Sequence, residues 1–205
     1  LGTRLRSGNV STLKKFAWLS VATAIVTIAL KVGAWWVTGS VGLLSDAAES
    51  VVNLVAAVIA LGAISVSERP ADDDHQYGHS KAEYFSAGVE GAMIFVAAAF
   101  ILVVSVERLI NPAPLEALGV GLAISVVAAV LNGVVGLVLV RAGVRHRSPT
   151  LRADGKHLLT DVITSVGVVV GVALAWATGW QVLDPIVAIG VGLNILFIGY
   201  RLVHE

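Results

Sequence analysis

Two ionisable residues, His157 and Asp161, stand four positions apart near the start of a long apolar run. On a helix they would share one face and lie one turn apart. The run that follows them, 162–177, has no charged residue and is long enough to belong to a membrane span. An ionised group inside a span costs about 2.5–3.5 kcal/mol, so it usually faces a polar interior or a partner.

A second polar stripe has the same helical spacing in another apolar run, and it consists of Ser45, Glu49 and Asn53. The two stripes together offer two carboxylates, an amide oxygen and an imidazole, which can surround Zn²⁺, Fe²⁺, Mn²⁺ or Co²⁺. The carboxylates would neutralise the ion, and the imidazole and a desolvated carboxylate could also exchange protons. The alternative is a structural cluster of hydrogen bonds between helices, but two such pairs favour a metal site.

The composition predicts a membrane protein. The chain has 205 residues, of which 57% are apolar and 14% charged, and its mean hydropathy is +0.86, too high for a soluble domain of this size. The net charge of zero argues against nucleic-acid binding, and the lack of cysteine excludes disulfides and thiolate ligands. The chain starts at Leu1 without a distinct signal-peptide pattern, so we expect a trimmed chain or a fragment.

The apolar runs predict an all-α membrane protein, a six-transmembrane-helix bundle with both termini cytoplasmic. After a flexible N-terminal leader at 1–12, the six-helix transmembrane domain would fill 13–205. Lys and Arg gather before the first span and after the second and fourth, which marks the cytoplasmic side, whereas the opposite side offers only Arg108. The expected helices are at about 13–38, 41–66, 81–110, 115–141, 150–178 and 183–204.

The two polar pairs would lie at a similar depth in the membrane. The second span runs inward, so Glu49 and Asn53 would lie roughly 12–18 Å from its outer end. The fifth span runs outward, which places His157 and Asp161 roughly 10–17 Å from its inner end. Because the hydrocarbon core is about 30 Å thick, both pairs would be near its middle and could meet.

Other polar residues of the spans allow more than one role. Ser45 and Asp46 could support the metal ligands or form part of a proton path, and Asp46 could equally bond to a neighbouring helix. Glu90 could serve a proton path, although a structural hydrogen bond is favoured. Two amides, Asn132 and Asn194, could form hydrogen bonds between helices. The glycines of the spans could let helices pack closely, and they are Gly88, Gly91, Gly133, Gly136, Gly167, Gly171, Gly190 and Gly192.

The connection after the second span carries Asp72, His75 and His79. Carboxylate and imidazole donors this close together could form an exposed metal site. The spacing alone favours the alternative, a solvated acidic loop with two surface histidines.

Three motifs make the chain resemble the cation diffusion facilitators, a family of six-span divalent-metal transporters. The motifs are specific only in combination, and the resemblance runs from the first span to Glu205. They are Gly42 to Glu49, Pro70 to Glu83, and Ala153-Asp154 with His157 and Asp161. The resemblance implies a transport site on Glu49, Asn53, His157 and Asp161. The family commonly has His or Asp at the first of these positions and Asp at the second, so the departures leave the metal open.

The resemblance implies further features. Asp72, His75 and His79 would form a second metal site, and Lys81 would lie near the interface of a homodimer. Members exchange cytoplasmic metal for external protons by alternating access, usually as efflux. They usually end in a cytoplasmic domain with a ferredoxin-like fold, which we do not expect within these 205 residues.

We therefore expect a proton-coupled efflux transporter, a metal cation/proton antiporter and not an enzyme, in the plasma (inner) membrane of a bacterium. The metal is its substrate, with Zn²⁺ ranked first, then Fe²⁺ and Mn²⁺, and Co²⁺ considered; no organic cofactor is expected. Its partners would be the lipid bilayer, the metal cation, protons and a second copy, and not nucleic acid. The alternative is a non-transporting metal sensor or scaffold. Two classes of membrane enzyme do not fit the sequence. A metalloprotease would need an HExxH helix, which the sequence lacks, and a phosphotransferase would need further spaced aspartates after Asp161, where none occurs before Asp184.

Overall fold

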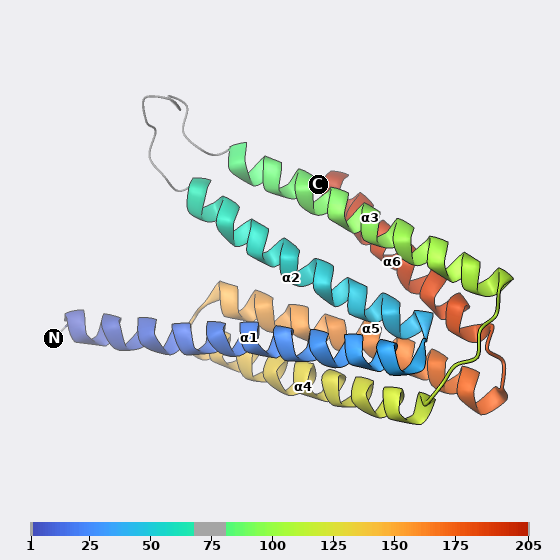
Figure 1. The fold of residues 1–205 in the computed structure, drawn as a ribbon. Helices are drawn as coiled ribbons and strands as arrows, with labels where there is room; N and C mark the ends of the chain where they lie inside the picture. Colours follow the sequence, from blue (N-terminus) through green and yellow to red (C-terminus); the bar gives the residue numbers. More distant parts are fainter. Residues whose placement is uncertain (1, 68–80, 205) are drawn as a thin grey trace.

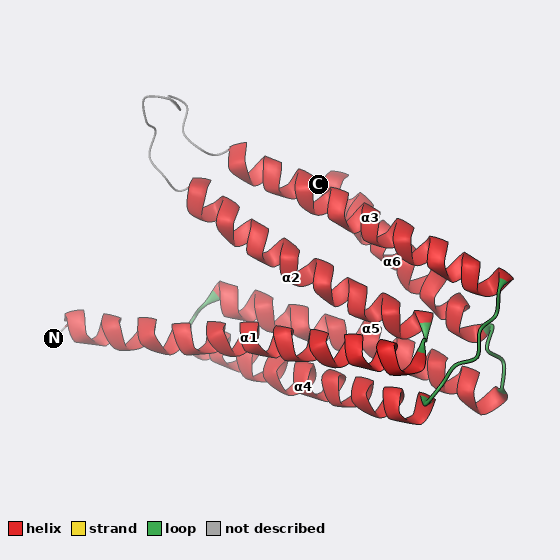
Figure 2. Cartoon of the chain, viewed as in Figure 1, coloured by secondary structure: helices red, strands yellow, loops and turns green. Residues whose placement is uncertain are grey.

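The computed structural model describes residues 2–67 and 81–204 of the chain. Every regular element within these ranges is an α-helix, and successive helices run in opposite directions along a bundle (Figures 1 and 2). In chain order they are α1 (Gly2–Thr38), α2 (Val41–Ser67), α3 (Lys81–Ile110), α4 (Leu118–Arg145), α5 (Pro149–Thr178) and α6 (Leu183–His204).

The all-α prediction is confirmed over the described ranges. Four stretches in this part of the chain are long and apolar enough to cross a membrane, and α6 contributes the shorter apolar stretch Leu183–Phe197. The four are Lys15–Thr38, Gly91–Ile110, Leu118–Arg145 and Thr150–Thr178. The count of six spans and the cytoplasmic position of both termini stay predictions.

Two helix starts differ from the sequence-based expectation. α1 begins at Gly2 instead of near residue 13, since the segment assigned to a leader has no proline and a single internal glycine costs a helix only about 1 kcal/mol. α4 begins at Leu118 because Ala117 has a left-handed backbone, with φ 42° and ψ 36°. Just before it, the Glu116 N–H donates to the Thr38 carbonyl at 3.1 Å, which ties the connection to the end of α1.

The fifth helix has the ends that its sequence predicts. Ser148 caps its N-terminus by accepting a hydrogen bond from the Leu151 N–H at 3.4 Å, and Pro149 takes the first helical position. Gly179 ends the helix with a left-handed φ of 72°. These ends set the register of α5, and therefore where Asp161 lies along it.

The helices form two groups, α1 with α4 and α5, and α2 with α3 and α6 (Figure 1). The groups lie close together at the end where α1 passes to α2 and α5 passes to α6. In the same view their axes separate toward the end at which α1 and α5 begin. The second helix bridges the two groups, because it also contacts α1 and α5.

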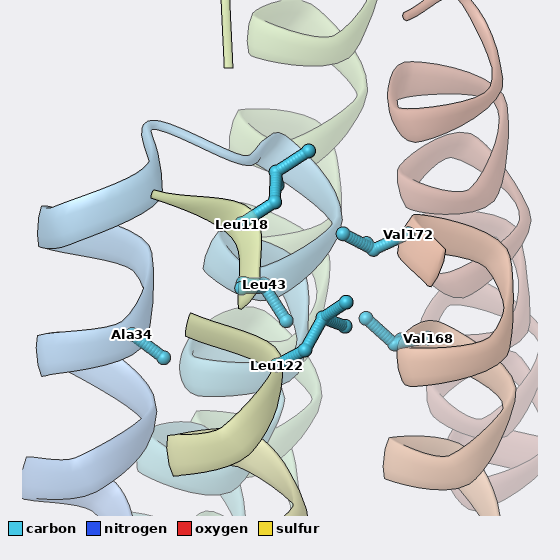
Figure 3. Packing of buried hydrophobic residues seen from close by; sticks show 6 residues of the cluster. All are labelled: Ala34, Leu43, Leu118, Leu122, Val168 and Val172. Atoms are coloured by element: carbon cyan, nitrogen blue, oxygen red, sulfur yellow. The ribbon is translucent and has the colours of Figure 1, made fainter. Parts of the chain in front are cut away.

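A hydrophobic cluster joins four helices where the groups lie close together (Figure 3). Its side chains point toward one another from α1, α2, α4 and α5, and they are Ala34, Leu43, Leu118, Leu122, Val168 and Val172. Large apolar side chains also cover the outside of the bundle, among them Phe95 (64% exposed), Ile163 (73%) and Phe197 (65%). An apolar exterior of this kind suits contact with lipid.

Close packing of α4 on α5 depends on two glycines. A Cβ added at Gly155 would lie 2.7 Å from the Gly136 carbonyl oxygen and 2.7 Å from the Val140 amide nitrogen. Real Cβ atoms essentially never approach backbone atoms so closely. Small residues therefore allow the backbones of these two helices to touch, as membrane helices often do.

Candidate functional site

A buried ion-pair network lies between the two groups of helices. Lys31 of α1 is 1% exposed, and its ammonium nitrogen lies 3.0 Å from Asp46 Oδ1 and 2.9 Å from Asp161 Oδ2. The same nitrogen donates to Ser50 Oγ at 2.7 Å. An ammonium has three hydrogens to donate, so these three acceptors satisfy it.

Three neutral side chains complete the network around the two carboxylates. Asn132 Nδ2 donates to Asp161 Oδ2 at 2.5 Å, and Ser50 Oγ donates to Asp161 Oδ1 at 3.0 Å. Ser165 Oγ donates to Asp46 Oδ1 at 2.8 Å. The network therefore draws on α1, α2, α4 and α5, and both oxygens of Asp161 accept hydrogen bonds.

The other predicted carboxylate, Glu49, lies on α2 away from these bonds. It is 7% exposed, and its Oε2 has no hydrogen-bond partner within the described ranges. Glu49 and Asn53 line a small cavity of about 20 Å³, together with Val52 of the same helix, Ile94 of α3 and Ile195 of α6. This volume has room for one water-sized occupant. A buried carboxylate oxygen without a partner is costly, so this atom is suited to receive a cation or a proton.

His157 is exposed, although it lies on α5 only one turn before the buried Asp161. Among the side chains that the structure describes, no three from His, Asp or Glu lie close enough together to hold a metal ion. This conformation thus engages Asp161 with Lys31 and places Glu49 with Asn53 at a separate cavity. The shared transport site on Glu49, Asn53, His157 and Asp161 stays a prediction.

The remaining predicted residues differ in what the structure reports of them. Ser45 is fully buried, and its hydroxyl donates to the Gly42 carbonyl at 2.7 Å. Asp46 bonds to neighbouring helices, one of the two roles considered for it. Lys81 and Glu90 lie on α3, but their side chains are outside the described part of the structure, and so are Asp72, His75 and His79 with their whole loop.

Lys31 is the charged member of the network that the motif analysis missed. It is the only charged residue in the run 16–37, and an ionisable residue within a span indicates a functional site by default. That signal was available without a structure. Asn132 was expected to bond across helices, and its bond from α4 to Asp161 on α5 confirms this.

A separate buried carboxylate, Asp184, positions the start of α2. It is fully buried at the start of α6 and accepts hydrogen bonds from the backbone N–H groups of Val41 at 2.8 Å and Gly42 at 3.0 Å. The Ser40 hydroxyl donates to it at 2.5 Å. The first N–H groups of a helix have no partner within the helix, so Asp184 caps α2 from another element. This bond fixes the register from which Asp46 and Glu49 follow.

Comparisons with known proteins agree with the membrane architecture. A family model described as the cation efflux transmembrane domain matches residues 17–205. The uncharacterized transporter sll1263 of Synechocystis sp. is 55% identical over 192 residues, which are 94% of this chain and 62% of that protein. The cation-efflux pumps FieF of Salmonella arizonae and Klebsiella pneumoniae are each 32% identical over 94% of this chain and 64% of their own length. The chain thus spans less than two thirds of the length of these curated relatives.

Proposed function

The chain belongs to the cation diffusion facilitator family of transmembrane cation-efflux proteins, and on that premise we propose that it exports a divalent transition metal in exchange for protons. The observation that carries the proposal is the burial of Glu49 on α2 and Asp161 on α5, two carboxylates inside an apolar bundle. Carboxylates are expensive in such a place unless they serve a cation, a proton or a partner.

The metal would bind between α2 and α5, on Glu49, Asn53, His157 and Asp161. Glu49 Oε2 supports this, because it is a buried acceptor without a partner in the described part of the chain, and Glu49 lines the same cavity as Asn53. For all four donors to meet, Asp161 must leave Lys31 and the α5 face carrying His157 must approach α2. The approach of the two helix groups would supply that movement, since their axes separate toward the end where α5 begins (Figure 1).

The exchange with protons follows from the chemistry of the donors. Imidazole and carboxylate groups must lose their protons to bind a metal, so metal and protons compete for the same atoms. In the inward-facing state the site would take metal as protons leave. In the outward-facing state returning protons would release it. The protein would act in the bacterial inner membrane as a homodimer, with Lys81 near the interface and a second metal site on Asp72, His75 and His79.

The donor set ranks the candidate metals. Nitrogen and oxygen donors suit Zn²⁺, Fe²⁺, Mn²⁺ and Co²⁺, and imidazole favours these over hard ions such as Mg²⁺. Asn53 supplies a neutral amide oxygen where the family commonly has an aspartate, which weakens the preference for Zn²⁺ alone. We rank Zn²⁺ first, then Fe²⁺ and Mn²⁺.

Metal flux into proteoliposomes tests the proposal. The full-length protein would be reconstituted with a pH gradient and offered Zn²⁺, Fe²⁺ under reducing conditions, Mn²⁺ and Co²⁺ separately. We expect flux that follows the proton gradient and falls to the level of empty vesicles in Asp161→Ala. Thr160→Ala is the matched control, because Thr160 is the adjacent exposed residue and its hydroxyl donates within α5, to the Lys156 carbonyl at 3.1 Å.

The possible failures of this test are distinct. Flux that ignores the pH gradient would contradict proton coupling but not metal transport. Full flux in Asp161→Ala would contradict the site. Metal binding without flux in the full-length protein would favour a sensor or scaffold over a carrier.

A further inference from the structure

Lys31 has no part in the proposed exchange of metal for protons, yet all three hydrogens of its buried ammonium have an acceptor in the network. Its ammonium is buried with three acceptors at 2.7–3.0 Å, contributed by α2 and α5. Two of these acceptors are carboxylates, Asp46 and Asp161. Asp161 is also a proposed metal ligand, so one carboxylate has two candidate cations.

The geometry around Asp161 leaves little freedom for both cations. Its Oδ2 accepts from Lys31 at 2.9 Å and from Asn132, while its Oδ1 accepts from Ser50 at 3.0 Å. A dication bound to this carboxylate would lie within a few ångströms of the ammonium. In an interior without water to screen them, two such positive charges repel strongly.

We propose that Lys31 is a tethered cation that competes with the transported metal for Asp161. This inference rests on the proposed role of Asp161 as a metal ligand. Lys31 belongs to α1, so the competition would couple this helix to occupancy of the site between α2 and α5. Lys31 does not bind metal itself; it is a positioning residue that acts through Asp161.

A count of charges explains why two aspartates surround Lys31. When the ammonium is shared by Asp46 and Asp161, the trio carries one net negative charge. When a dication takes Asp161 together with Glu49, those three charges sum to zero, and Lys31 stays with Asp46 as a second neutral pair. Asp46 therefore anchors the ammonium in both arrangements, and Asp161 alternates between them. Charge pairing of this kind is what an apolar interior requires.

The proposal predicts opposite changes in affinity and turnover. Without the ammonium, nothing displaces the metal from Asp161, so binding should tighten and release should slow. We expect Lys31→Met to lower the Kd for Zn²⁺ by about tenfold, a typical size for coupling between two competing states. The same variant should lower both KM and kcat for Zn²⁺ flux, a combination that simple loss of structure does not produce.

The experiment uses the full-length protein and Zn²⁺ as the probe. Affinity is measured in detergent by competition with a metal indicator, and initial rates are measured in proteoliposomes. Lys31→Gln accompanies Lys31→Met as a milder change that keeps a hydrogen-bond donor, and Lys31→Arg keeps the charge and should stay nearer to the parent protein than either. Asp46→Asn should shift affinity the other way, because it frees the ammonium to hold Asp161 alone.

The Zn²⁺ affinities of these variants decide whether Lys31 competes with the metal. Equal or weaker Zn²⁺ binding in the Lys31→Met and Lys31→Gln variants would overturn the competition and leave Lys31 a structural role. If neither variant folds, Asp46→Asn decides, since unchanged or tighter binding there would equally overturn it. Unchanged affinity in Asp161→Asn would instead overturn the proposed transport site, whatever the Lys31 variants do.

Discussion

At the scale of single residues, the two helices of the proposed site hold their carboxylates in different ways. Asp161 on α5 accepts three hydrogen bonds, one of them from an ammonium, whereas Glu49 on α2 keeps one oxygen without a partner in the described ranges. Asn53 lines the same cavity as Glu49, and its amide oxygen carries no formal charge. The α2 half of the proposed site therefore carries one negative charge less than two carboxylates would give it.

Asn53→Asp tests what that missing charge does. The added carboxylate should bind a dication more strongly, because an ionised oxygen neutralises charge that an amide cannot. We expect the Kd for Zn²⁺ to fall by about tenfold, which corresponds to about 1.4 kcal/mol of binding free energy. Competition with a metal indicator measures this for each ion in turn. Asn194→Asp on the exposed face of α6 is the matched control, and an equal change there would contradict a direct role for residue 53.

At the scale of elements, α4 packs closely against α5, and this contact sets the height of Asp161 against Asn132. Gly155 and Gly136 make this contact possible, because a Cβ at Gly155 would lie 2.7 Å from backbone atoms of α4. By contrast, a Cβ at Gly167 on the same helix would have nothing within 4 Å. One helix thus carries a glycine that packing requires and one that it does not.

Substituting the two glycines separates packing from helix propensity. Gly155→Ala should lower the free energy of unfolding by about 1–3 kcal/mol, since an overpacked contact must push the helices apart. Gly167→Ala should be neutral or stabilising by up to about 1 kcal/mol, because alanine favours the helix. Thermal unfolding of the purified protein in detergent measures both. Equal effects of the two changes on the free energy of unfolding would mean that the α4–α5 contact at Gly155 is not tight enough to exclude a methyl group.

Local chemistry explains which elements could be predicted from the sequence. The two ends of α3 and α5 and the start of α6 lie within a residue of their expected positions, because proline, glycine and capping residues mark them. The start of α4 could not be predicted, since it depends on a left-handed alanine and a bond to the end of α1. Within the site, helical spacing located Asp161, but the reach of Lys31 from α1 across to α2 and α5 depends on tertiary packing that spacing does not contain.

At the scale of the whole molecule, the two helix groups meet at one end and diverge toward the other (Figure 1). The cap of α2 by Asp184 and the four-helix cluster with Leu43 lie at the end where the groups meet. The exposed His157 lies on α5 toward the end where they diverge. Which side of the membrane each end faces therefore decides whether this arrangement faces inward or outward.

Positive charge favours the inward-facing assignment. The last residue of α4 is Arg145, and the connection from α4 to α5 carries Arg147. The connection between α5 and α6, at the other end of the bundle, carries no Lys or Arg between Gly179 and Val182. Basic connections stay in the cytoplasm, so the diverging end and the N-terminus should both lie there.

Because the chain has no cysteine, single introduced thiols report this orientation without background. Arg147 and Gln181 are both exposed, and they lie on connections at opposite ends of the bundle. In inside-out vesicles a membrane-impermeant maleimide should label Arg147→Cys and leave Gln181→Cys unlabelled until detergent is added, and right-side-out vesicles should show the reverse. The opposite labelling pattern would mean that the diverging end of the bundle faces the outside of the cell. His157 would then first meet ions from outside, and the proposed direction of transport would have to begin from a different conformation.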